Sequence, residues 1–192
     1  MKTLQSCVNE TLFDGKDKVK SAEARAWLDI FYKYAVDRNN DPIEGNKLFD
    51  IKLHEDGLYI SQKKGPAALN IQHIKGRKTP TMNIKYFDGR LYVSDNEISS
   101  LEGIFAPDCI FKGILIINND KNLKSFVGCP KKIEWSNVVG QGMSITNNEN
   151  LESLDGFPKI STGIKSIYMI NNDKLNDFID PDLTKKIKKL IK

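Results

Sequence analysis

Two short sequence patterns recur four times in the second half of the chain, and this repetition restricts the fold more than any other feature. The first pattern alternates apolar with other residues and ends in asparagine; its copies are residues 91–96, 114–119, 143–148 and 167–172. They start 23, 29 and 24 residues apart. A second pattern, apolar-x-x-apolar-x-Gly, follows each copy, with Asp180 in place of the last glycine. Repeats of roughly 20 to 50 residues are typical of solenoids, whose coils bury apolar side chains against their neighbours.

The alternation within each copy predicts a short strand whose first and third residues point inward. Strands of successive coils would then stack in parallel and bury a column of apolar side chains. The sixth residue lies where the chain leaves the sheet, and it is asparagine in every copy: Asn96, Asn119, Asn148 and Asn172. An amide side chain both donates and accepts, so we expect it to satisfy backbone groups that water cannot reach.

Residues 91 to about 182 therefore resemble irregular leucine-rich repeats. The sequence motif N-N-x-x-L-x-S-L-x-G-x-P is similar to that of repeat proteins encoded by large tailed bacteriophages. The N-terminal segments of those proteins often have a sequence similar to residues 8–14 here. The repeats of this chain are fewer and less even than in that family. The resemblance implies a phage-encoded protein that is either a structural component of the virion or an effector directed at the host.

The first half of the chain reads differently. Residues 1–45 are predicted to be helical, because apolar side chains recur there at helical spacing: Trp27, Leu28, Phe31, Tyr34 and Ala35. From residue 46 the apolar period becomes two. Turn signals at Asp56-Gly57 and Asp88-Gly89 then predict two β-hairpins. Residues 46–90 are therefore predicted to form a small antiparallel β cap.

The last ten residues hold the positive charge of the chain. The net charge is +4, but residues 183–192 carry five lysines and no acid, so the rest sums to −1. The lysines are Lys185, Lys186, Lys188, Lys189 and Lys192. Apolar residues at helical spacing between them predict an amphipathic helix that caps the solenoid. The alternative is contact between these lysines and a nucleic acid.

Together these segments predict an α+β protein. It would have a helical N-terminal arm (1–45), an antiparallel β cap (46–90), a short leucine-rich-repeat-like solenoid with a parallel sheet (91–182) and a C-terminal helical cap (183–192). Carboxylates follow the asparagines at Glu97, Asp120, Glu149 and Asp173, and we expect them to form a solvated loop edge interleaved with lysine.

The outward side of the solenoid sheet is the candidate binding surface, because alternate strand residues there are not needed for the core. The pattern places five large side chains on it: Tyr92, Leu115, Ile117, Tyr168 and Ile170. They would form a partly apolar patch for a protein partner of unknown identity, with the tyrosines as anchors. The alternative is that the N-terminal helix or the tail folds over this side and makes it core.

Catalytic and metal-binding signatures are not found in the sequence. There is no phosphate-binding loop, dinucleotide fingerprint, H-E-x-x-H or G-x-S-x-G. His54 and His73 have no clustered ligand pattern, and the three cysteines fit reduced thiols. We therefore expect a non-enzymatic, cytoplasmic protein without cofactor or membrane contact, which acts in protein–protein interaction or assembly. A nucleic-acid-binding accessory protein that uses the lysine tail is the alternative.

Overall fold

The computed structural model describes residues 35–36, 42–43, 45–54, 56–63, 65, 67–72, 82–160 and 167–178. Nearly all regular structure in this part of the chain is β. The strands are β1 (Ala35–Val36), β2 (Pro42–Ile43), β3 (Phe49–His54), β4 (Gly57–Gln62), β5 (Ala68–Gln72), β6 (Ile84–Ser94), β7 (Phe105–Asn118), β8 (Lys132–Glu134), β9 (Gly142–Thr146), β10 (Lys159–Ile160) and β11 (Ile167–Ile170). The described helices are α3 (Gly45–Leu48) and α4 (Asp173–Phe178).

The first predicted hairpin is confirmed. Strands β3 and β4 pair antiparallel, with His54 opposite Gly57 next to the turn and Phe49 opposite Gln62 at the far end. Gly57 has a φ of 142°, and a Cβ atom there would lie 2.2 Å from the carbonyl oxygen of Asn83. The hairpin therefore needs glycine at this position both for its backbone conformation and for its close contact with the next coil.

The second predicted hairpin is wrong. Residues 84–94 form the single strand β6, which continues through Asp88 and Gly89 without reversing. A two-residue type I′ turn needs positive φ at both central residues, and here only Gly89 has it, at 151°. The period-two alternation continues across the glycine, so Phe87, Leu91 and Val93 all enter one core.

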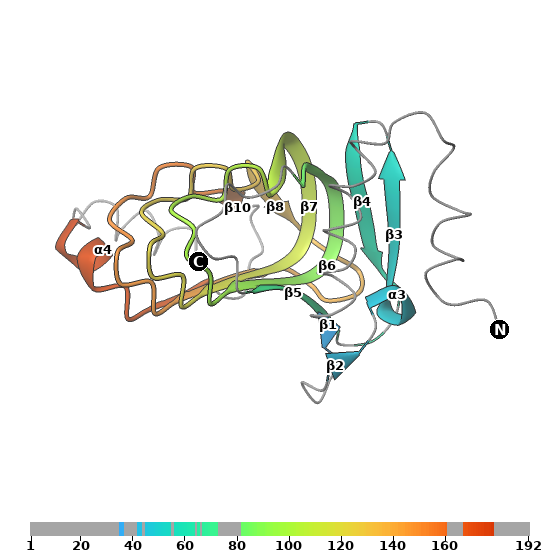
Figure 1. Cartoon of the computed structure of the whole chain (residues 1–192), viewed down its shortest axis with the longest axis horizontal. Helices are drawn as coiled ribbons and strands as arrows, with labels where there is room; N and C mark the ends of the chain where they lie inside the picture. The colour runs from blue at the N-terminus through green and yellow to red at the C-terminus, as the bar shows by residue number, and fades with distance from the viewer. Residues whose placement is uncertain are drawn as a thin grey trace.

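A parallel solenoid is confirmed, in about four turns. It begins before residue 91, because β4 and β5 already pair parallel with β6. Among the described strands of the predicted antiparallel cap at 46–90, only β3 and β4 pair antiparallel with each other. The chain winds so that β6 and β7 run parallel. Ile84 lies opposite Phe105, the register then shifts, and pairing is regular from Tyr86 opposite Ile110 to Ser94 opposite Asn118. Their first halves pair with β4 and β8, and β10 continues this side. Their second halves pair with β5 and β9, and β11 continues that side. We call these the first and the second sheet face; in Figure 1 β6 and β7 are the long curved ribbons that join them.

Two glycines stand where β6 and β7 pass from one face to the other. Gly89 lies directly opposite Gly113 in the parallel register. A Cβ atom on Gly113, whose φ is 119°, would lie only 1.9 Å from the carbonyl oxygen of Gly89. The corner of the solenoid is thus tight enough to exclude any side chain at this position.

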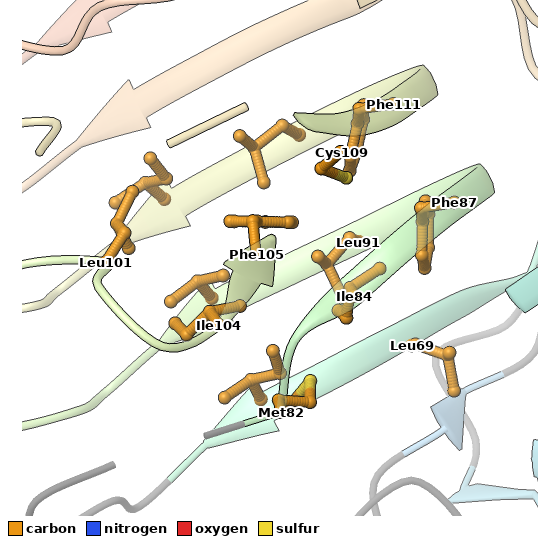
Figure 2. Close-up of a cluster of buried hydrophobic side chains, with 14 of the residues drawn as sticks. Leu69, Met82, Ile84, Phe87, Leu91, Leu101, Ile104, Phe105, Cys109 and Phe111 are labelled. Atoms are coloured by element: carbon orange, nitrogen blue, oxygen red, sulfur yellow. The ribbon is translucent and has the colours of Figure 1, made fainter. Parts of the chain in front are cut away.

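The core fills the space inside the coils. Equivalent apolar side chains lie above one another on neighbouring coils, such as Phe87 and Phe111, whose rings stack with centroids 5.0 Å apart (Figure 2). Leu91 and Leu115 form the same kind of pair on the second face, and both are fully buried. Burial of this column, worth roughly 25 cal/mol for each Å² of apolar surface, ties each coil to the next.

The ends of the chain differ from the prediction or lie outside the described residues. Ala35, which was predicted to be helical, lies in strand β1, where it pairs antiparallel with Leu69 of β5. Backbone pairing with the sheet overrides the local helical spacing here. The rest of the predicted N-terminal helices and the capping helix at 183–192 fall outside the described residues, so the helical arm and cap stay predictions.

Replacing Gly113 with alanine should destabilise the protein by more than about 3 kcal/mol, because the methyl group would collide with the backbone of Gly89. Gly65→Ala is the matched control. Gly65 also has positive φ, at 69°, but no atom lies within 4 Å of its Cβ position, so about 1 to 2 kcal/mol is expected. Urea unfolding of both variants measures the difference; equal losses would contradict the tight corner.

Candidate protein-binding face

Two rows of side chains on the second sheet face point away from the core, because they alternate with buried residues. The first row is Asn70, Tyr92, Ile116, Ser144 and Tyr168. The second row is Gln72, Ser94, Asn118, Thr146 and Ile170. None of these ten side chains is charged, although 28% of the residues in the chain are. We call this surface the uncharged face.

Exposure of the uncharged face increases toward the last strand. Asn70 and Ser94, near its start, are only 7% and 5% exposed. Tyr168 and Ile170 on β11 are 57% and 53% exposed. Figure 1 shows α4, which follows β11, at the opposite end of the solenoid from β3 and β4. The accessible part of the face is therefore the end remote from the hairpin.

Two of the predicted contact residues are wrong. Leu115 and Ile117 are both fully buried in the core, so they cannot contact a partner. In the parallel register Leu91 pairs with Leu115, Leu115 with Met143, and Met143 with Ile167. Successive copies of the pattern therefore start 24, 28 and 24 residues apart. The sequence alignment placed the second copy one residue too early, and in a strand that error exchanges inward and outward side chains. The structure places Ile116 outward instead, and Tyr92, Tyr168 and Ile170 lie on the face as predicted.

A buried ladder of polar side chains fixes the rim of this face. Its members are Asn96, Asp120, Asn148 and Asn172, none of them more than 2% exposed. The backbone N–H of each of the first three donates to a side-chain oxygen of the next, at 2.8, 3.0 and 3.1 Å. Asn119, predicted for this ladder, lies one residue before it.

The residue before each ladder position makes the turn itself. Asp95, Asn119, Asn147 and Asn171 all have φ between 55° and 58°. Asparagine and aspartate tolerate this left-handed conformation better than other residues with a side chain. Their side chains also join across coils, as in the 3.1 Å hydrogen bond from Asn119 Nδ2 to Asp95 Oδ1. The two polar residues of each turn thus have separate tasks, one in the backbone turn and one in the buried ladder.

The predicted loop edge of carboxylates is corrected by the same shift. Asp120 belongs to the buried ladder and is not part of the solvated edge. Lys121 takes its place in the exposed column, between Glu97 and Glu149, with Asp173 at the end. The lysine therefore separates carboxylates that would otherwise repel one another.

A corner loop, residues 135–141, is the second feature that the repeat pattern missed. Lys112 pairs with Glu134, and Ile114 pairs with Gly142. The seven residues of the loop therefore lie where the preceding coil has the single residue Gly113. Ser136 holds the loop from inside, exchanging backbone hydrogen bonds with Gly140 at 3.0 and 2.9 Å. Trp135 points outward and is 55% exposed. The uneven repeat period was the signal for this loop, because insertions in solenoids map to one surface.

The first sheet face carries a groove of about 330 Å³ lined by Asp50, Lys52, His54, Tyr59, Ser61 and Tyr86. His54 packs edge-on against Tyr59, with ring centroids 4.7 Å apart. The hydroxyl group of Tyr59 donates to Asp56, and this hydrogen bond raises the pKa of the tyrosine. Asp50 and Lys52 form an exposed ion pair, so the charges of the groove are partly paired with one another.

The other reactive groups are constrained by burial. Burial raises the pKa of the Cys109 thiol to about 12 and also raises that of Cys129, so neither is a thiolate at neutral pH.

Within the described ranges, no group of three or more His, Cys, Asp or Glu residues is placed to hold a metal ion. Neither described helix is long and apolar enough to cross a membrane. The five tail lysines and His73 lie outside these ranges.

Comparison of the chain with protein-family models, with curated proteins and with solved structures gives no match.

Replacing Asn148 with alanine should destabilise the protein by about 3 to 5 kcal/mol. It would leave unpaired the backbone N–H of Asp120 and the carbonyl oxygen of Ile117, and an unpaired buried polar group costs about 1 to 3 kcal/mol. Asn150→Ala is the matched control, since that exposed side chain bonds only at the surface, to Lys121 and Lys174. Denaturant unfolding should show a loss below about 1 kcal/mol for the control; similar losses would argue against the ladder.

Proposed function

We propose that this protein is a non-catalytic interaction or assembly module that binds a protein partner on the uncharged face. One observation carries the proposal. Ten outward positions on five neighbouring strands have no charged side chain, in a chain where 28% of residues are charged. Asn70 and Ser94 are buried, but the other eight positions are partly or fully exposed, and a sheet surface in contact with solvent would ordinarily include lysine and glutamate.

The composition of the face supports a protein partner. Its residues are tyrosine, isoleucine, serine, threonine, asparagine and glutamine. Charge depletion and tyrosine enrichment distinguish the centre of protein interfaces from other surface, and tyrosine with serine and asparagine is typical of antibody paratopes. Tyr168 and Ile170 supply exposed apolar area at its accessible end. The ladder below holds the rim rigid, so little conformational entropy would be lost on binding.

The biological setting belongs to the same proposal. The repeated sequence motif of residues 91–182 supports a leucine-rich-repeat-like protein of a tailed phage, which would act in the virion or in the host cytoplasm. Binding of nucleic acid through Lys185, Lys186, Lys188, Lys189 and Lys192 is the alternative. The uncharged face offers no attraction for phosphate, so a nucleic acid would depend on the tail alone.

A photoreactive phenylalanine analogue at position 168 should cross-link the partner in native or infected cells, and mass spectrometry of the product would identify it. The same analogue at position 135 is the matched control, because Trp135 is equally exposed but lies on the corner loop. The same product from both positions, or from position 135 alone, would contradict binding on this face.

With the partner identified, the Tyr92→Ala/Tyr168→Ala variant should bind it at least tenfold more weakly, because tyrosine anchors typically contribute more than about 1.4 kcal/mol each. Titration calorimetry measures the change, and an unaltered melting temperature shows that the variant is folded. Trp135→Ala should bind like the wild type. Normal binding by the folded double variant would refute the proposal; binding lost only on deletion of residues 183–192 would support the tail instead.

A further inference from the structure

Asp120 is the only acidic residue in the buried ladder, and it stands where the other coils have asparagine. Its side chain is fully buried. One oxygen, Oδ1, accepts the backbone N–H of Asn96 at 2.8 Å, as the amide oxygens of Asn148 and Asn172 accept from the coil before them. In this respect the carboxyl group replaces an amide without loss.

The other oxygen, Oδ2, can replace the Nδ2 donor of an asparagine only if it carries a hydrogen. Each asparagine of the ladder uses Nδ2 to donate to a strand carbonyl oxygen of the preceding coil. The three bonds reach Ile71, Ile117 and Ile145, at 3.0, 3.3 and 3.0 Å. The parallel register makes Val93 the equivalent residue for Asp120. Oδ2 of Asp120 is buried and has no hydrogen-bond partner in the described structure, so by this equivalence it takes the place of the amide Nδ2.

We propose that Asp120 is a neutral carboxylic acid in the folded protein, with its proton on Oδ2 and donated to the carbonyl oxygen of Val93. In this form it reproduces both halves of an asparagine side chain and completes the ladder. When the proton leaves to solvent, two oxygens with lone pairs face each other in a buried site, and the turn between the coils of β6 and β7 is weakened. Asp120 therefore makes this joint of the solenoid sensitive to pH.

The surroundings of Asp120 agree with this assignment. Burial raises its pKa to about 7, against an opposing effect of the hydrogen bonds from Asn96. The charged group that faces it is Asp95, at the end of β6, and this carboxylate raises the pKa further. Asn148, on the opposite side, presents an uncharged amide. No cation acts on Asp120 among the described groups that affect its pKa, so nothing there compensates a buried negative charge.

The pH dependence follows from the direction of the shift. The unfolded chain loses the Asp120 proton near pH 3.8, whereas the folded chain keeps it to about pH 7. Between these values the folded state binds one more proton, so stability falls as pH rises from about 4 to about 7 and is then constant for this group. A gap of about three pKa units corresponds to at most about a thousandfold change in the folding equilibrium.

Asp120→Asn tests this directly, because it supplies the donor permanently. At pH 8 the melting temperature of the variant should exceed that of the wild type by an amount on the order of 10 °C, and near pH 4 the two should agree within about 2 °C. Asp155→Asn is the matched control: this exposed aspartate lies outside the ladder, and its variant should follow the wild-type curve at both pH values. Parallel curves for Asp120→Asn and the wild type would overturn the proposal.

A measurement on the unmodified protein guards against a variant that rearranges. The ¹³C chemical shift of the Asp120 carboxyl group should titrate with a midpoint near 7, well above the value of about 3.9 for an aspartate in an unstructured peptide. A midpoint below about 5 would show that the folded protein holds an ionised carboxylate, and the assignment of the proton to Oδ2 would be wrong.

Discussion

The hydrogen-bonded ladder of Asn96, Asp120, Asn148 and Asn172 is the contact on which the rest of the solenoid depends. The ladder pairs buried carbonyl oxygens of the strands and buried N–H groups of the turns, and each would cost about 1 to 3 kcal/mol if unpaired. A side chain that donates and accepts satisfies both kinds of group at once. Because Asn96, Asp120 and Asn148 each bond to the next coil, the ladder also helps to fix the parallel register, and the register decides which side chains enter the core.

With that register fixed, the two sheet faces acquire different surfaces. The first face carries paired charges and aromatic rings, such as Asp50 with Lys52 and His54 with Tyr59. The second face carries no charge over ten positions. The glycine corner between them, Gly89 on Gly113, lets one strand contribute to both faces and keeps the coils in close contact. The uncharged face thus depends on the ladder, since the ladder fixes the end of each strand that carries the face.

Part of the candidate site could be predicted from sequence, and its failures share one physical cause. Period-two alternation and the repeated polar doublets predicted parallel coils and an outward Tyr92, Tyr168 and Ile170. In the second coil the doublet is Asn119-Asp120, preceded by Asn118, so matching asparagine to asparagine shifted the copy by one residue. The pattern was defined by asparagine at its sixth position, so the aspartate that occupies this position in the second coil did not match it.

The sequence by itself determined that this chain winds into parallel coils, because apolar alternation and polar turns recur at the spacing that lets coils bury one another. The tertiary structure decided what local patterns cannot express. Asp88-Gly89 lies within a strand because the next coil packs on Gly89, although the same dipeptide type, Asp56-Gly57, lies at the end of the hairpin, where Gly57 pairs with His54 next to the turn. Asp120 is buried between Asn96 and Asn148 of the neighbouring coils, which lie 24 and 28 residues away in the chain. Contacts between coils, and not adjacent residues, set the conformation of these glycines and the burial of this carboxyl group.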